Sequence, residues 1–126
     1  MSKQEARAQA LGALYGADVL SLDEVDSSGL SRRASALATG TWTDREAIDE
    51  ALGSASTRWR IERMPAVDRN ILRLATYELT RTELPKAVVI SEAVELAKQY
   101  STSKSGAFVN GVLSAIADGE SESTRV

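Results

Sequence analysis

The chain has 126 residues, enough for one domain with a sizeable core, and it contains neither cysteine nor histidine. Disulfides, thiolate chemistry, histidine-dependent catalysis and nearly all zinc sites are therefore excluded. The net charge of −3 does not indicate a nucleic-acid binder, but residues 1–57 carry five basic and nine acidic side chains, whereas residues 58–117 carry nine basic and six acidic.

The first part of the chain predicts two helices joined by a loop. Apolar residues recur at helical spacing over 3–19. Residues 18–29 are acidic and rich in Ser, Asp and Gly, which is typical of a loop. A second helix is expected over 30–39 and is expected to end at Gly40, because glycine is common just beyond a helix end.

A third helix is expected to start at Thr43, whose hydroxyl would form a capping box with Glu46. Further on, Ser56 and Thr57 offer caps for a short helix that carries Trp59.

The second half predicts three longer helices. They are expected over 65–82, 85–100 and 104–117, and the first two begin at prolines, which suit the first helical turn. Tyr100 falls on the apolar stripe of the middle one. Residues 118–126 are small and polar.

These elements predict an all-α fold, a compact bundle of six to seven helices. Alanine and leucine are frequent, prolines are only two, and no period-2 alternation indicates a strand. We expect one domain at 1–117 and a disordered polar tail at 118–126. No apolar run approaches the roughly 20 residues of a membrane span, and no signal peptide is recognisable, so we expect a cytoplasmic protein without a membrane segment.

The chain offers little for catalysis. The neighbouring acids at 49/50, 62/68 and 92/95 are read as charged helix faces more readily than as acid–base pairs. No glycine-rich phosphate loop is present. We therefore expect no enzyme activity, no cofactor and no metal.

Three basic or hydroxyl-rich segments have two readings each. The stretch 58–63 contains three arginines and continues to Arg69 and Arg73; these arginines either meet phosphate or form a solvated face paired with Glu62, Asp68 and Glu78. The segment 101–111 either binds phosphate and stacks a base at a helix N-terminus, or simply caps that helix.

The third segment lies on the first helix. Lys3, Arg7 and Tyr15 share roughly one side of it. That stripe suits single-stranded RNA, and it equally suits an ordinary amphipathic helix.

Several motifs together resemble one known family. They are Val-Asp-Arg-Asn-Ile-Leu-Arg-Leu-Ala at 67–75, Glu-Ala-Val-Glu-Leu-Ala-Lys at 92–98 and Phe-Val-Asn-Gly-Val-Leu at 108–113, supported by Ala-Leu-Tyr at 13–15 and by Trp59. In this order they resemble the bacterial transcription antitermination factors of the NusB family.

The resemblance implies an all-helical fold of two small sub-bundles, without catalysis or cofactor. It implies pairing with NusE, a small-subunit ribosomal protein, and binding of the heterodimer to single-stranded boxA RNA in ribosomal RNA leader transcripts. It places the chain in the antitermination complex of RNA polymerase. Monomer and homodimer stay open for the free protein, and so does an alternative function, a helical protein-interaction module with a weakened RNA surface.

The resemblance also implies site residues. The positions that match the RNA surface of the family are Lys3, Arg7, Tyr15, Lys104, Ser105, Phe108 and Asn110. Those that match the acidic surface for NusE are Glu62 and Asp68. One departure is Glu5, which stands where the family often has a cation, so we expect weak RNA binding without NusE. The interpretation requires Tyr15 and Lys104 to lie on the same side of the molecule.

Overall fold

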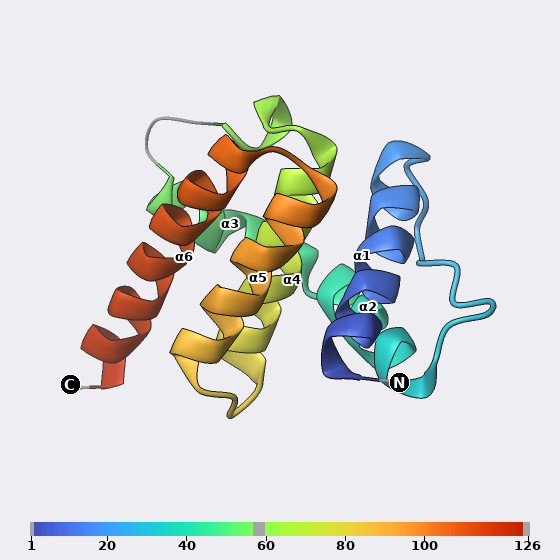
Figure 1. The fold of residues 1–126 in the computed structure, drawn as a ribbon, viewed down its shortest axis with the longest axis horizontal. Coiled ribbons are helices and arrows are strands. Elements are labelled where there is room, and N and C mark those ends of the chain that lie inside the picture. Colours follow the sequence, from blue (N-terminus) through green and yellow to red (C-terminus); the bar gives the residue numbers. More distant parts are fainter. Residues whose placement is uncertain (1, 57–59, 125–126) are drawn as a thin grey trace.

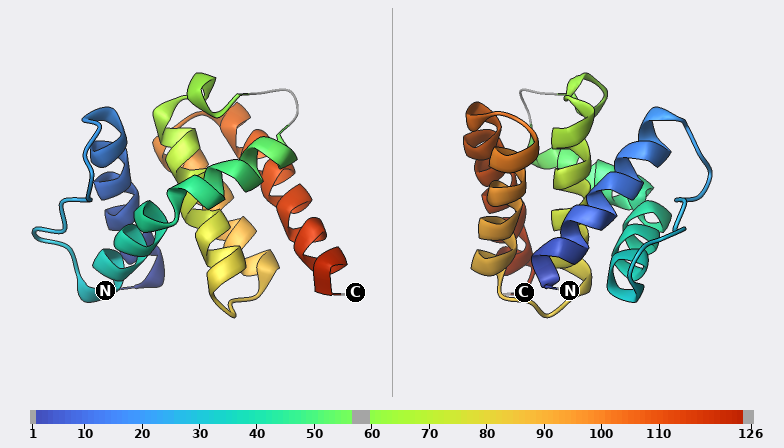
Figure 2. Two further views of the ribbon diagram at one scale, coloured as in Figure 1. Left: turned by 180° about the vertical axis from the view of Figure 1, so that it is seen from behind. Right: turned by 45° about the vertical axis from the view of Figure 1, so that its right-hand side comes forward.

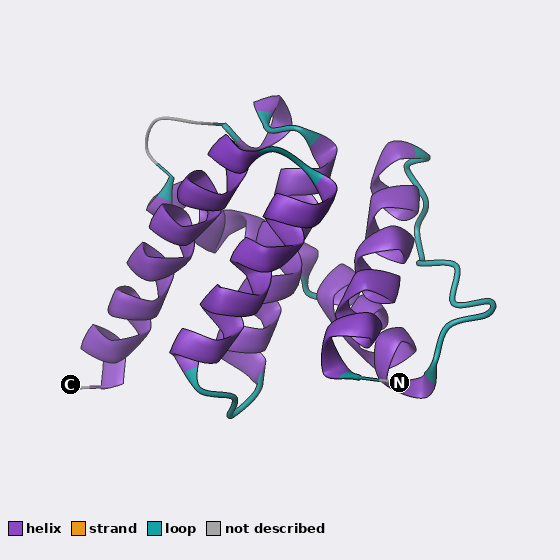
Figure 3. Ribbon diagram, in the orientation of Figure 1, coloured by secondary structure: helices purple, strands orange, loops and turns teal. Residues whose placement is uncertain are grey.

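The computed structural model describes residues 2–56 and 60–124, which form six α-helices and one short 3₁₀ helix (Figure 1). In chain order these are α1 (Lys3–Val19), α2 (Arg32–Thr43), α3 (Arg45–Ala55), η1 (Ile61–Arg63), α4 (Ala66–Arg81), α5 (Lys86–Tyr100) and α6 (Ser103–Thr124). The described residues contain helices and loops only, which confirms the all-α class (Figure 3). The predicted cap at Thr57 and Trp59, which the predicted short helix was expected to carry, lie outside the described residues.

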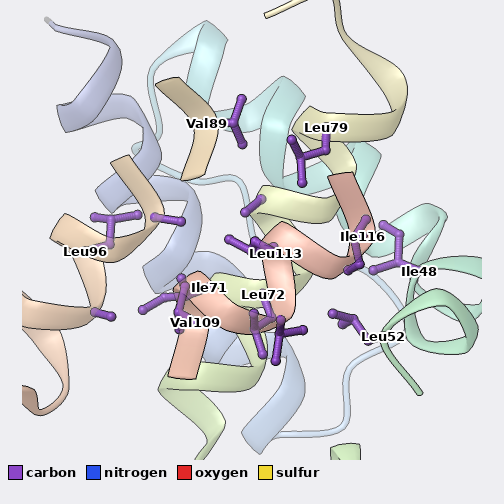
Figure 4. Packing of buried hydrophobic residues seen from close by; sticks show 14 of the residues in the cluster. Ile48, Leu52, Ile71, Leu72, Leu79, Val89, Leu96, Val109, Leu113 and Ile116 are labelled. Carbon is purple, nitrogen blue, oxygen red and sulfur yellow. The ribbon is translucent and has the colours of Figure 1, made fainter. Parts of the chain in front are cut away.

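Two apolar clusters divide the molecule into two helical groups. The larger cluster lies between α3, α4, α5 and α6 (Figure 4) and includes Ile48, Leu52, Ile71, Leu72, Leu79, Val89, Leu96, Val109, Leu113 and Ile116. The smaller cluster packs α1 and α2 against the middle of α4 and consists of Ala10, Leu14, Ala17, Ala38, Trp42 and Leu74. Helix α4 contributes to both clusters, so it joins the two groups (Figure 2). This agrees with the two sub-bundles that the resemblance implied.

Helix α1 begins and ends where the apolar pattern predicted, and Glu5 has a structural role at its start. The Ser2 hydroxyl accepts the Glu5 backbone N–H at 3.0 Å, and the Glu5 carboxylate accepts the Ser2 backbone N–H at 3.3 Å. This is a capping box, which satisfies two backbone donors that the helix leaves free. The hydrogen bond from the Ser2 backbone, with a second from its side chain, lowers the pKa of Glu5 below 4.5. Glu5 therefore stabilises the helix start.

The predicted boundary between the second and third helices was wrong. Helix α2 continues through Gly40 to Thr43, and α3 begins at Arg45 without a side-chain cap, so the expected capping box does not form. Gly40 does not end a helix; it allows close packing between α2 and α4. A Cβ at this position would overlap the Tyr77 hydroxyl on α4, so the missing side chain lets α2 and α4 approach closely.

The later helices match the prediction closely at their starts. Helix α4 begins after Pro65 and α5 after Pro85. Helix α6 is the longest and runs past Ala117, where the apolar pattern stops, to Thr124. The disordered tail at 118–126 stays a prediction. None of the helices in the described part of the chain is both long and apolar enough to cross a membrane.

Candidate nucleic-acid interface

The first turn of α4 ties the end of α1 to the η1 turn. The Asp18 carboxylate, near the end of α1, accepts hydrogen bonds from Arg69 at 2.7 Å and Asn70 at 2.8 Å. Arg69 also donates to the backbone carbonyls of Ile61 and Met64 at 3.2 and 3.1 Å. One guanidinium therefore fixes the position of η1 relative to α1 and α4.

The same turn of α4 also holds the start of α6. The Ser105 hydroxyl donates to Asp68 Oδ2 at 2.8 Å, and both residues are buried. Thr102 caps α6, because its hydroxyl accepts the Ser105 backbone N–H at 3.1 Å. The hydroxyls of Ser101 and Thr102 each lie 3.0 Å from that of Ser105. The reading of these hydroxyls as helix caps is thus confirmed for Thr102, whereas Ser105 is a buried link between α6 and α4. The reading of the segment as an RNA site stays a prediction.

An open cavity of about 450 Å³ lies where these elements meet. Its lining residues come from the η1 turn, the start of α4 and the first turns of α6, and they are Arg63, Met64, Pro65, Asp68, Lys104, Ser105 and Phe108. Arg63 and Lys104 are exposed, whereas Phe108 is half-buried and also packs against the larger core. The structure therefore brings three predicted RNA residues to one cavity, together with a cation from the basic stretch.

Tyr15 lies on the same end of the molecule as this cavity. It is 42% exposed in the C-terminal half of α1. All three views place that half of α1 and the first turn of α6 toward one end (Figures 1 and 2). Both are tied to the first turn of α4, α1 through Asp18 and Arg69 and α6 through Ser105 and Asp68. The helix segments that carry Tyr15 and Lys104 thus lie toward the same end of the molecule, and a shared RNA surface of the two side chains stays a prediction.

The sequence interpretation missed a second exposed tyrosine at this end. Tyr100 is the last residue of α5, directly before the connection to α6, and it is 48% exposed. Its place on the apolar stripe predicted burial, and that prediction was wrong. The buried part of the stripe ends one turn earlier, at Leu96 and Ala97, and Tyr100 is the last residue of the helix. The helix-breaking run of hydroxyl residues after Tyr100 was the available signal.

Lys3 lies at the other end of α1. It lines a separate cavity of about 200 Å³ with Arg33 and Leu84. Twelve residues of α-helix separate Lys3 from Tyr15, a rise of roughly 18 Å. The structure therefore does not bring Lys3 to the cavity around Lys104.

Arg7 is buried and forms an ion pair with Glu78. Its Nε lies 2.9 and 3.1 Å from the two carboxylate oxygens, and its Nη2 lies 2.9 Å from one of them. The side chains are 6% and 3% exposed. A direct contact between Arg7 and an RNA phosphate would require this pair to break. The expectation that Glu78 pairs with an arginine of 58–63 or with Arg69 or Arg73 was wrong, because Glu78 faces α1.

Arg69 and Arg73 of α4 are also paired with acids of this molecule. Arg73 binds both oxygens of Asp49 at 2.8 Å and lies 3.2 Å from Asp18. Burial would lower the pKa of Arg73, but the bonds and charges of Asp49 and Asp18 outweigh it and raise the pKa. Burial alone would raise the pKa of Asp18. The hydrogen bonds from Arg69 and Asn70 and the charges of Arg73 and Arg69 outweigh this effect and lower the pKa below 3.8. Arg63 and Lys104 are therefore better placed than these residues to meet an anion.

The two predicted partner acids have different environments. Glu62 is exposed on η1, whereas Asp68 is only 4% exposed. Asn110, predicted for RNA, is exposed on α6. Of this pair of acids, only Glu62 offers its carboxylate at the surface as the structure stands.

Comparisons with known proteins identify the family. A sequence model of the NusB family matches residues 4–118. The transcription antitermination protein NusB of Anaeromyxobacter dehalogenans (strain 2CP-1) is 46% identical over 131 aligned residues, which cover 93% of this chain and 91% of that protein.

Solved structures agree. NusB of T. maritima superimposes with a TM-score of 0.81 at 32% identity, covering 94% of this chain and 92% of that one. A crystal structure of antitermination factors NusB and NusE in complex with double-stranded RNA gives a TM-score of 0.77 at 29% identity, covering 93% and 96%.

Proposed function

Because the chain belongs to the NusB family, we propose that it binds single-stranded boxA-type RNA together with NusE. Members of this family are RNA-binding transcription antitermination factors, so the chain is not an enzyme. The specific target we assign is the boxA element of ribosomal RNA leader transcripts, bound in the cytoplasm within the antitermination complex of RNA polymerase.

One observation carries this proposal: the cavity at the start of α6 combines cations with an aromatic wall. Lys104 and Arg63 supply positive charge, and Phe108 supplies an apolar ring. Phosphates are bound by such cations, and unpaired bases stack on aromatic rings. Single-stranded RNA presents both groups within one nucleotide.

The two exposed tyrosines extend this surface. Tyr15 lies in the C-terminal half of α1, and Tyr100 is the last residue of α5, directly before the connection to α6. Each stacked base adds roughly 1–3 kcal/mol of binding free energy. We therefore draw the RNA path from Tyr15 across the α5–α6 connection to Lys104, with Asn110 beyond it on α6.

The two basic residues predicted on α1 take different roles. Arg7 positions α1 through its pair with Glu78 and makes no direct RNA contact. Lys3, at the far end of α1, binds phosphate only where the strand is long enough to run along that helix.

NusE binding is assigned to the exposed carboxylate of Glu62. A basic side chain of NusE would form a charge-assisted hydrogen bond there. Because only a few exposed cations face the proposed RNA path, RNA binding by the chain alone is weak and NusE strengthens it.

The test is a titration of a boxA oligonucleotide with the chain, with NusE, and with both. We expect the mixture to bind at least about tenfold more tightly than either protein alone. The same sequence in duplex form is run beside it, because a related complex holds double-stranded RNA. No gain from NusE, or tighter binding of the duplex, would contradict the proposal, and formation of a NusE complex without RNA binding would support the protein-interaction module instead.

The tyrosines are tested in the same assay. We expect Tyr15→Ala combined with Tyr100→Ala to weaken RNA binding by the heterodimer. The control is Val88→Ala, which removes an equally exposed apolar side chain near the start of α5. Equal effects of the two changes would show that the path is drawn wrongly.

A further inference from the structure

A smaller cavity lies where the starts of α1 and α2 meet the end of α4 and the α4–α5 connection. Its volume is about 200 Å³, and we call it the α1–α2 cavity. Figures 1 and 2 show these segments toward one end of the molecule and the start of α6 toward the other. The lining residues are Lys3, Arg7, Arg33, Leu37, Glu78, Thr82 and Leu84. The proposed RNA path does not use this end.

The inner polar groups of the α1–α2 cavity already have partners within the chain. Arg7 Nε lies 2.9 and 3.1 Å from the two carboxylate oxygens of Glu78. The Thr82 hydroxyl donates to the backbone carbonyl of Glu78. Leu37 and Leu84 are half-buried and supply the aliphatic part of the wall. A group that enters meets paired charges and aliphatic carbon, so an apolar group suits the interior best.

The rim of the cavity is basic. Of the described lining residues, only Lys3 and Arg33 are exposed. Neither side chain has an ion-pair or hydrogen-bond partner among the residues that the structure describes. Both lie in the first turn of a helix, where the helix dipole adds positive potential. The opening therefore favours negative charge beside the apolar group.

The size of the cavity limits what can fill it. Its volume of about 200 Å³ is below the roughly 300–1,000 Å³ of small-molecule sites, whereas roughly 150 Å³ is enough to hold benzene. One bulky side chain therefore fits. An inorganic anion would leave both leucines uncovered, and an RNA base would find no aromatic ring to stack on among the described lining residues.

We propose that the α1–α2 cavity docks an acidic segment of a partner protein. One bulky aliphatic or aromatic side chain of that segment packs on Leu37 and Leu84, as an anchor residue does in a protein interface. Flanking carboxylates bind Arg33 and Lys3, and the planar guanidinium of Arg33 matches a carboxylate with two parallel hydrogen bonds. This inference does not rest on the proposed RNA-binding function, and it leaves the RNA surface at the other end free.

The experiment titrates the whole chain into four fluorescein-labelled peptides, Ser-Asp-Asp-X-Asp-Asp-Ser, in which X is Leu, Met, Phe or Ser. We expect the tightest of the three apolar peptides to bind at least about tenfold more tightly than the serine peptide, because one bulky side chain leaves water. All four peptides carry the same charge, so this ratio reports on the cavity. Equal binding of all four peptides to the wild type would overturn the inference.

A matched pair of variants tests the position of the site. Arg32 and Arg33 are both exposed in the first turn of α2, but only Arg33 lines the cavity. Glutamate suits a first helical turn, so both variants should fold. We expect Arg33→Glu to weaken the tightest peptide at least about fivefold and Arg32→Glu less than twofold, at a salt concentration that screens distant charges. Equal effects would mean a diffuse basic surface and would overturn the inference.

Two further outcomes separate this site from the RNA surface. We expect the tightest peptide to bind the chain in complex with NusE and boxA RNA within about twofold of its affinity for the chain alone, and displacement by these partners would overturn the placement. A uridine hexamer that is weakened by Arg33→Glu, with no preference among the peptides, would assign the rim to RNA and overturn peptide docking. Absence of RNA binding would overturn the proposed function and leave this inference standing.

Discussion

Breaking the buried pair between Arg7 and Glu78 should lower the free energy of unfolding, and it should not remove an RNA contact. The pair has three N–O distances of 2.9–3.1 Å, and both side chains are almost fully buried. Arg7→Ala would leave the Glu78 carboxylate charged, buried and without its bidentate donor. Removal of one partner of a buried pair costs about 3–5 kcal/mol of unfolding free energy.

The magnitude is large for a domain of this size. Small domains have unfolding free energies of roughly 5–15 kcal/mol. A change of 3–5 kcal/mol would lower the melting temperature by roughly 12–20 °C, at about 4 °C per kcal/mol. Replacement of both partners by apolar residues, Arg7→Met with Glu78→Leu, should restore most of the loss, because neither charge then stays buried alone.

Urea unfolding of the wild type, Arg7→Ala and the double variant measures these differences, with RNA titration of the double variant beside it. We expect the folded double variant to bind RNA like the wild type. A loss below about 1 kcal/mol in Arg7→Ala would show that the pair is solvated, and a loss of RNA affinity in the stable double variant would return Arg7 to the RNA surface. Either result would refute the reasoning.

Three other predictions follow from single contacts. Gly40→Ala should cost about 1–3 kcal/mol because the new methyl group overlaps Tyr77, whereas Gly53→Ala, in an open position of α3, should stabilise by about 0.5–1 kcal/mol; equal effects in thermal melting would contradict this. The pKa of Asp18 is lowered below 3.8, so its ionised carboxylate stabilises the fold above that pH, and this stabilisation is lost as the pH falls through the lowered pKa. Asp18→Asn should therefore be less stable than the wild type at neutral pH and should lose less stability in acid. Parallel pH profiles of unfolding free energy for the two proteins would count against this. Phe108→Ala, at a half-buried ring, should cost roughly 1.5–2.5 kcal/mol, about half of a full burial, and should also weaken RNA binding; an unchanged RNA affinity in the folded variant would remove Phe108 from the site.

The helices were predictable because their signals are local. Recurrence of apolar residues at helical spacing gave α1 its bounds, and prolines marked the starts of α4 and α5. Gly40 misled the prediction, because glycine at a helix end and glycine at a close helix crossing look the same in sequence. Only the partner, Tyr77 on another helix, distinguishes the two.

The candidate site was only partly predictable for the same reason. Lys104, Ser105 and Phe108 adjoin in sequence, so their meeting in one cavity follows from a single helix turn. The partner of Arg7 lies 71 residues away, and burial of its charge depends on how α1 docks on α4. Spacing along one helix predicts which residues share a side, but it does not predict which charges another helix covers.

The salt dependence of boxA RNA binding by the heterodimer tests the central claim most directly. Lys104→Glu is compared with Arg32→Glu, the same change at an exposed arginine where α2 begins. We predict that Lys104→Glu weakens binding and makes the slope of log K against log salt shallower by about 0.7, the value for one phosphate contact on a single strand, while Arg32→Glu changes neither. Equal slopes and affinities for the two variants would contradict an RNA surface at the start of α6.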